Sequence, residues 1–200
     1  MLEACRVSNN WEYMGNMIPA LCKKRGQSKQ AISSLVAEAT KLLDITPNYQ
    51  VKMELLQVLR TATEGKIFLE VERAKLSQML SQIREAEGNI KEATAIMHEL
   101  QIETFGGLSK REKVEFLLEQ MRLGILCQDF MKTEIISRKI SSKFFQNEEN
   151  QDLKLKYCQL MIQISLNEMK YHNCSQFYLE IAQIHEKKAE RLLSLEVCFF

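Results

Sequence analysis

The sequence contains few of the residues that interrupt helices. Only two of its 200 residues are proline and seven are glycine. The residues that favour helix most strongly, Ala, Leu, Glu, Lys, Gln, Met and Arg, are abundant instead. No segment alternates apolar and polar residues over a long stretch, which argues against a β-sheet protein. The composition therefore predicts an all-α protein.

Long apolar runs and an excess of one charge are also missing. No run approaches the roughly 18 apolar residues of a membrane-spanning helix. The net charge is +1, so the overall balance indicates neither nucleic acid nor a membrane surface as a partner. The chain is polar within a few residues of Met1, and we expect no signal peptide.

The cysteines lack the spacing of a metal or redox site. A C-x-x-C pair is missing, and zinc would need four ligands. His172-Asn173-Cys174 is the one local cluster, and a thiol enzyme would need Cys and His to meet beside an orienting group. We therefore expect no catalytic, cofactor-binding or metal-binding residue, and reduced thiols in the cytoplasm or nucleus. The other residues of these types are Cys5, Cys22, Cys127, Cys158, Cys198, His98 and His185. We expect Cys127 and Cys158 in the core and His98 at the surface.

Two adjacent glycines raise the question of a phosphate-binding loop. Such a loop needs G-x-x-x-x-G-K-[ST] between a strand and a helix, and Gly106-Gly107-Leu108-Ser109-Lys110 has a different spacing. The preceding segment has a helical period, so we expect one glycine to end that helix in the left-handed conformation. Ser109 and Glu112 then match a capping box at the start of the next helix.

Turn-forming residues divide the chain into helical segments. Thr46-Pro47, for example, separates two of them, because proline is tolerated only in the first turn of a helix. The predicted helices cover residues 2–14, 17–25, 28–44, 48–64, 67–86, 89–103, 110–126, 130–145, 150–168 and 171–196.

Two of these helices carry apolar residues on opposite faces. In 110–126, one stripe is Val114, Leu117, Leu118, Met121 and Ile125, and the other is Phe116, Leu123 and Cys127. In 150–168, one stripe is Leu153, Tyr157, Leu160 and Ile164, and the other is Leu155, Cys158, Ile162, Leu166 and Met169. An ordinary surface helix has a single stripe. Two stripes predict packing against a hairpin partner and against a neighbouring hairpin, as in an α-solenoid.

A weak internal repeat also favours stacked hairpins. "GNIKEA", "QDFMKT" and "MKYHNC" begin at Gly88, Gln128 and Met169, which by subtraction are 40 and then 41 residues apart. Each contains an apolar residue and, three positions later, a small one that lets two antiparallel helices approach: Ile90 and Ala93, Phe130 and Thr133, Tyr171 and Cys174. The period is nearer to the ~40-residue helical repeats than to the tetratricopeptide repeat.

Three longer segments resemble a known family. They are "EGKIFLEVERAKLSQML" from Glu64, "KEATAIMHELQIETFGGLSKREKVEFLLEQMRL" from Lys91 and "IISRKISSKFFQ" from Ile135. All three closely resemble the PCI family of scaffold subunits in the lid of the proteasome regulatory particle. The resemblance is good over residues 26–157, is weaker before them, and fades over a divergent end at residues 172–200.

The resemblance implies a single helical-repeat arm over residues 1–200. Its fold would be a right-handed α-solenoid of antiparallel helical hairpins with tetratricopeptide-like or HEAT-like repeats. The PCI winged-helix module of the family is absent from the sequence. Together with the apolar ending "LLSLEVCFF" from Leu192, this absence suggests a truncated or diverged form.

The implied function is that of a non-catalytic scaffold subunit in ubiquitin-dependent protein degradation. Its expected partners are other lid subunits and the core particle, with no small-molecule substrate, cofactor, nucleic acid or membrane. One alternative is a tetratricopeptide-like adaptor that binds short peptides in its groove. Others are an arm of another PCI assembly such as the signalosome, a truncated copy that is not incorporated, and, last, an enzyme.

Some charged and aromatic residues have two interpretations. The aromatic pairs Phe144-Phe145 and Phe177-Tyr178 belong either to the core or to a contact with a partner arm. Glu148-Glu149 would favour the N-terminus of the helix that follows, rather than form an acid–base pair. The charges from Lys110 to Lys113 are expected to form a solvated face with i,i+4 ion pairs.

Overall fold

The computed structural model describes residues 2–24 and 26–197, and every regular element within these residues is a helix. This confirms the predicted all-α class. Arg25, the last residue of the helix predicted over 17–25, lies outside the described residues. Cys198 and the apolar side chains from Leu192 onward lie outside them as well. None of the described helices is both long enough and apolar enough to span a membrane.

The chain divides into two compact units, residues 1–108 and 109–200. The first contains α1 (Leu2–Val7), α2 (Trp11–Lys23), α3 (Lys29–Leu42), α4 (Tyr49–Thr63), the 3₁₀ turn η1 (Ile67–Leu69), α5 (Glu70–Ala86), α6 (Ile90–His98) and η2 (Ile102–Thr104). The second contains α7 (Lys110–Leu126), α8 (Phe130–Ser137), η3 (Ser142–Gln146), η4 (Glu148–Asn150), α9 (Gln151–Asn167) and α10 (Tyr171–Val197).

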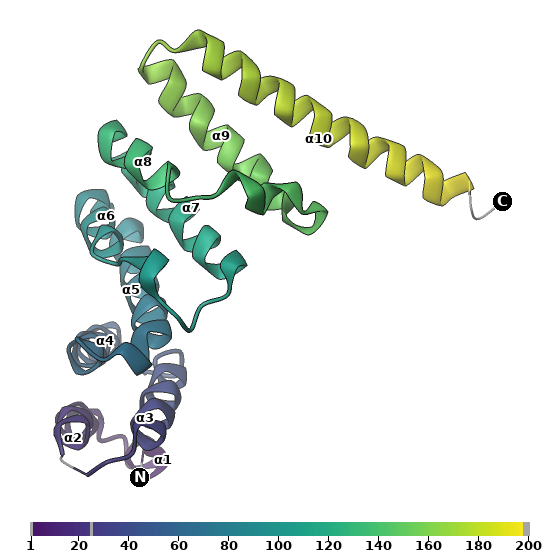
Figure 1. Ribbon diagram of the computed structural model, residues 1–200. Helices are drawn as coiled ribbons and strands as arrows, with labels where there is room; N and C mark the ends of the chain where they lie inside the picture. The colour runs from purple at the N-terminus through teal and green to yellow at the C-terminus, as the bar shows by residue number, and fades with distance from the viewer. Residues whose placement is uncertain (1, 25, 198–200) are drawn as a thin grey trace. The chain divides into compact units, whose positions relative to one another are not determined.

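The core of the first unit is formed where successive helices pack on one another. α2 contacts α4, α4 contacts α5, and α5 contacts α6; Figure 1 shows α2 and α4 nearly end-on, next to each other. The side chains that fill this core and are fully buried include Met14, Ile18, Leu43, Leu56, Leu59 and Leu76.

The core of the second unit confirms the two-sided pattern of α7. Its first stripe joins a hydrophobic cluster with α8 and α9, of which Val114, Leu117, Leu118, Met121, Ile136, Leu153 and Ile164 are members. Phe116 and Leu123, on the second stripe, are also buried but do not belong to that cluster. Both faces of α7 are therefore shielded from water.

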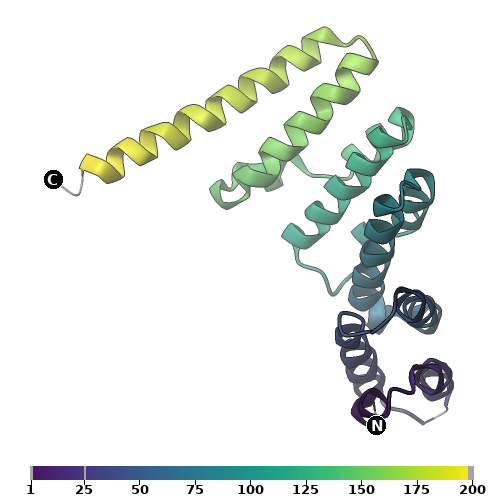
Figure 2. The ribbon, with the colours of Figure 1, turned by 180° about the vertical axis from the view of Figure 1, so that it is seen from behind.

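The second stripe of α9 is confirmed only in part. Cys158 and Ile162 are buried, whereas Leu166 and Met169 are 47% and 73% exposed. α9 and α10 run antiparallel, and in both views α10 extends beyond the start of α9 (Figure 1, Figure 2).

The first predicted helix boundary is wrong. A break was expected between 14 and 17, but the helices end and begin at Ser8-Asn9-Asn10. Asn9 adopts a left-handed φ of 53°, and the side chain of Asn10 accepts a hydrogen bond from the backbone N–H of Tyr13 and caps α2. Gly15 consequently lies inside α2.

The predicted helix over 130–145 is also wrong in its second half. α8 ends at Ser137, and the chain then forms η3 over residues 142–146. The side chain of Asn150 donates to the carbonyl oxygen of Phe144 at 3.1 Å and so connects the start of α9 to η3. The helix predicted over 89–103 is also too long: α6 ends at His98, and the 3₁₀ turn η2 follows it.

The expectation that Gly106 or Gly107 is left-handed is wrong, because neither has a positive φ. Gly107 is required for a different reason: a Cβ there would lie 2.8 Å from Cγ2 of Val71. The capping box that follows is confirmed, since Ser109 Oγ accepts from the N–H of Glu112 and the Glu112 carboxylate accepts from the N–H of Ser109.

The repeat predicted from the sequence coincides with a repeated turn. α6, α8 and α10 begin at Ile90, Phe130 and Tyr171, and the small residues Ala93, Thr133 and Cys174 are all buried. The residue before each helix cap, Gly88, Gln128 or Met169, has a left-handed φ of 82°, 61° or 56°. The paired hydrogen bonds of a Schellman motif close the turn each time, as from Gly88 to Glu85 and from Asn89 to Arg84.

Two buried serines on α5 provide a test of this packing. Ser77 Oγ is buried without a hydrogen-bond partner, whereas Ser81 Oγ, one turn later, donates to the carbonyl oxygen of Ala93 on α6 at 3.0 Å. We expect Ser77→Ala to stabilise the protein by about 1 kcal/mol, because it removes an unsatisfied hydroxyl. Ser81→Ala should destabilise it by about 1 kcal/mol. Urea unfolding followed by circular dichroism measures both, and equal losses for the two variants would contradict the assigned contacts.

Candidate interaction surface

The residues considered for catalysis or metal binding do not come together. His172 is exposed and lies 3.1 Å from the side-chain nitrogen of Gln176, whereas Cys174 is buried and His185 is exposed. Within the described residues, no three His, Cys, Asp or Glu side chains form a group that could hold a metal ion. The local cluster in the sequence is therefore spread over different faces of α10.

Cys158 is buried in an environment that keeps its thiol protonated. Burial is the main cause that raises its pKa, to about 11, and the nearby Glu180 carboxylate adds to the effect. A thiolate nucleophile requires the opposite shift. The prediction that Cys158 belongs to the core is confirmed, whereas Cys127 is only half-buried.

Arg111 fixes the start of α9 against the start of α7. Its guanidinium donates to the backbone carbonyl of Glu149 at 2.9 Å and forms an ion pair with Asp152. Burial favours a higher pKa for the Asp152 carboxyl. Hydrogen bonds donated by Arg111 and by the backbone N–H of Leu153 have the opposite effect and outweigh burial, so the pKa of Asp152 is lowered. Arg111 also pairs with Glu115 one turn along α7 at 3.2 Å, as expected for a solvated charged face.

An aromatic ladder connects η3, α9 and α10. The ring centroids of Phe144 and Phe145 are 5.5 Å apart, those of Phe145 and Tyr157 5.1 Å, and those of Tyr157 and Phe177 6.3 Å. These edge-to-face and tilted contacts favour the core interpretation of Phe144, Phe145 and Phe177. Tyr178 is 56% exposed and does not join the ladder.

A groove of about 720 Å³ lies beside the ladder, between η3, the start of α9 and α10. Phe145, Tyr157 and Phe177 form part of its wall. Lys154 and Glu180 line it as well, and their ion pair at 2.8 Å joins α9 to α10. These two charged groups of the groove thus link α9 to α10.

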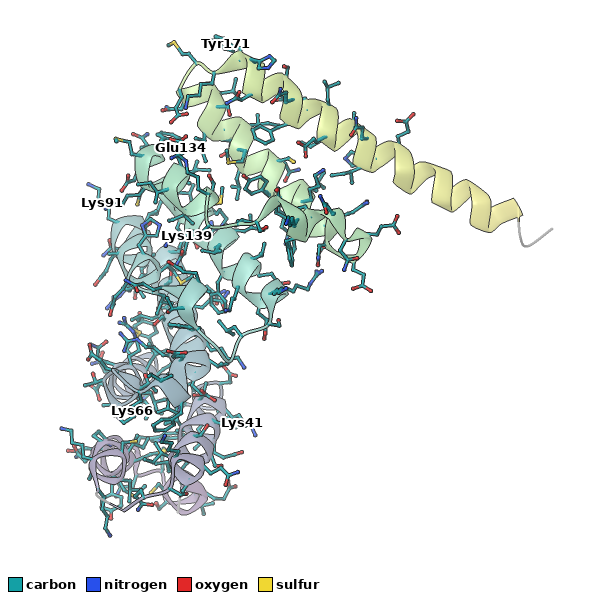
Figure 3. All side chains as sticks on the ribbon, viewed as in Figure 1. Lys41, Lys66, Lys91, Glu134, Lys139 and Tyr171 are labelled. Carbon is teal, nitrogen blue, oxygen red and sulfur yellow. The ribbon has the colours of Figure 1, made fainter. Side chains whose placement is uncertain are left out.

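Another group of exposed apolar side chains in the second unit lies where α8 adjoins the turn between α9 and α10. We call it the turn-edge patch. Its exposed fractions are 47–79%, and its members are Met131, Ile135, Leu166, Met169 and Tyr171. Met131 and Ile135 lie one turn apart on α8, and the other three flank the turn (Figure 3 labels Tyr171).

A salt bridge holds the two halves of this patch together. Glu134 on α8 lies 3.7 Å from the ammonium group of Lys170 in the turn, and Arg138 donates to it at 3.0 Å. The hydrogen bond from Arg138, with the charges of both cations, lowers the pKa of Glu134. This ion pair joins α8 to the turn that contains Met169.

Met169 occupies a position that disfavours its side chain. A non-glycine residue with a left-handed φ carries a strain of about 1 kcal/mol. The equivalent positions are Gly88 in the α5–α6 turn and Gln128 in the α7–α8 turn. The Met169 side chain is nevertheless 73% exposed and fills no part of the core. Packing against the core therefore does not account for a methionine at this position.

The turn-edge patch was not identified from the sequence. Leu166 and Met169 were assigned to a buried stripe, because helical periodicity alone does not show where a second packing partner ends. The aligned repeat does provide a signal, since Met169 stands where the first copy has glycine.

Comparison with known proteins places this architecture in a family. The model of the PSMD12/CSN4 N-terminal region matches residues 1–190, and thus extends past the segment 26–157 at both ends. The chain is similar to the 26S proteasome non-ATPase regulatory subunit 12 homolog A of Arabidopsis thaliana, with 41% identity over 77% of this chain. It is also similar to the 26S proteasome regulatory subunit rpn501 of Schizosaccharomyces pombe (37% over 96%) and to RPN5 of Saccharomyces cerevisiae (36% over 91%).

These relatives are longer than the chain, which covers 35%, 44% and 41% of their respective lengths. The matches confirm the resemblance first seen in the segments from Glu64, Lys91 and Ile135. A match over residues 1–190, together with the repeated helical hairpins, is sufficient to assign the family. The chain belongs to the PSMD12/CSN4 N-terminal family, related to the regulatory subunits of the 26S proteasome.

Proposed function

We propose that this chain is a non-catalytic scaffold that binds other subunits of the proteasome regulatory particle lid, and through them supports ubiquitin-dependent protein degradation. The observation that carries the proposal is the turn-edge patch in a chain of this family. Exposed apolar side chains on a fixed edge are the usual starting point of a permanent subunit interface. The core particle is a further proposed partner.

The fold that fits this role is a right-handed α-solenoid in which residues 1–200 form a single helical-repeat arm. In such a fold each hairpin buries one face against the next, as the two buried faces of α7 require. Docking through the edges of hairpins leaves this internal packing intact. The proposed location is the cytoplasm and nucleus, where reduced thiols persist.

The alternatives have less support. A thiol enzyme is disfavoured by the raised pKa of Cys158 and by the separation of His172 from Cys174. In the groove beside α10, the charged groups Lys154 and Glu180 are paired with each other rather than directed to a bound peptide. An arm of the signalosome remains the second candidate, because the matching family model includes CSN4.

A charge placed in the turn-edge patch tests the proposed function. We expect Ile135→Glu to leave the fold intact, since Ile135 is 59% exposed, but to reduce recovery of lid subunits with the tagged chain at least tenfold. The measurement is affinity purification from cells followed by quantitative mass spectrometry. Ile45→Glu, at a site 55% exposed in the first unit, is the matched control and should retain recovery. Recovery of signalosome subunits instead, or equal recovery with both variants, would refute the proposal.

A second test separates strain from binding at the left-handed turn positions. Met169→Gly should stabilise the isolated chain by about 1 kcal/mol, because glycine adopts the left-handed conformation without strain. It should also weaken association with lid subunits, because it removes an apolar contact. Gln128→Gly is the matched control one repeat earlier, and it should stabilise equally with association unchanged. Urea unfolding and the same purification give the two readouts, and unaltered association of Met169→Gly would remove Met169 from the interface.

A further inference from the structure

A second apolar groove lies in the first unit, on the surface between α2 and α4. Its volume is about 570 Å³, and its floor is formed by Val51, Leu55 and Val58 of α4. Trp11, at the start of α2, forms one wall and packs against the core of the unit. The lining spans Val51 to Val58 on α4, which corresponds to about 10 Å or roughly two helical turns.

A glycine inside α2 faces the open space of this groove. Gly15 lies in the middle of the helix, and a Cβ built there would have no heavy atom within 4 Å. Packing within the chain therefore does not require glycine, although glycine in a helix interior is less stable than alanine. A glycine facing an open apolar groove allows another backbone to approach closely.

The rim of the groove is acidic. Glu12 of α2 and Glu54 of α4 both line it. The described residues include no ion-pair partner for either carboxylate, and Glu54 accepts one hydrogen bond, from its neighbour Gln50 at 2.8 Å. Cations that approach the groove would thus meet two carboxylates on opposite walls.

We propose that the α2–α4 groove binds an amphipathic helix of a partner protein, with an apolar stripe over Gly15 and lysine or arginine on both flanks. The length of the groove fits about two turns of such a helix. The apolar stripe would cover Val51, Val58 and the ring of Trp11, and the flanking cations would pair with Glu12 and Glu54. This contact lies on a different unit from the turn-edge patch, so it adds a second docking surface to the proposed function.

Trp11 allows a direct test, because it is the only tryptophan in the chain. Two synthetic Ala-rich helices of about 18 residues serve as probes, since shorter peptides are marginally helical in water. Both carry the same leucine stripe and no tryptophan, and one has lysine flanks whereas the other has glutamate flanks. We expect the lysine-flanked peptide to shift Trp11 emission to shorter wavelength in a saturable manner. The glutamate-flanked peptide should bind more weakly, by a factor of about five or more.

Variants of the chain identify the groove as the binding site. Gly15→Leu fills the open space and should weaken binding of the lysine-flanked peptide at least tenfold. Ala20→Leu places the same side chain at an exposed position of α2 outside the groove lining, and should bind as the wild type does. Reversal of the rim charge by Glu12→Lys with Glu54→Lys should invert the preference toward the glutamate-flanked peptide. Circular dichroism of each variant checks that the helix content of the chain is retained.

Several results would overturn the assignment. Equal responses to the two peptides, or unchanged binding by Gly15→Leu, would exclude a groove that selects cationic helices. A concentration-dependent dimer of the chain, abolished by Gly15→Leu in size-exclusion chromatography, would make a second copy the occupant instead. These outcomes concern the groove alone, whereas failure of the wild-type chain to recover lid subunits would refute the proposed function.

Discussion

Burial of both faces of a helix is the constraint on which this structure depends. α7 places Val114 and Leu117 in one hydrophobic cluster and also shields Phe116 and Leu123 from water on its other side. A helix with two apolar faces is not stable at a surface, so it must have a packing partner on each side. The short turns between hairpins, the small residues Ala93, Thr133 and Cys174 at the helix crossings, and the ion pairs that join neighbouring helices all serve this packing.

The same constraint determines where binding surfaces are available. Because the faces of the helices are used for internal packing, the edges of the hairpins and the grooves between helix pairs remain for partners. On the second unit, the salt bridge between Glu134 and Lys170 fixes an apolar edge at the turn. On the first unit, Gly15 leaves a groove open between α2 and α4. Both surfaces combine exposed or partly exposed apolar side chains with charged neighbours.

The sequence predicted the elements whose signals are local. The helix over 110–126, its two stripes, the capping box of Ser109 and Glu112, and the positions of Ile90, Phe130 and Tyr171 at helix starts are all confirmed. The failures have physical reasons. The break at Asn9 depends on one left-handed residue and a side-chain cap, and the chain after α8 forms η3, where the side chain of Asn150 donates to the carbonyl oxygen of Phe144. The turn-edge patch was missed because exposure is set by tertiary packing: the periodicity that correctly buried Cys158 also assigned Met169 to the core.

The central claim is that the chain acts by docking apolar edges onto other subunits while its helices hold one another. Amide hydrogen exchange, measured on the chain alone and in the purified regulatory particle, tests it most directly. If the edges dock onto other subunits, amides of α8 and of the turn before Tyr171 should exchange more slowly in the particle, while the core of α4 should change little. Identical exchange of α8 and this turn in both states would show that this edge is not a docking surface.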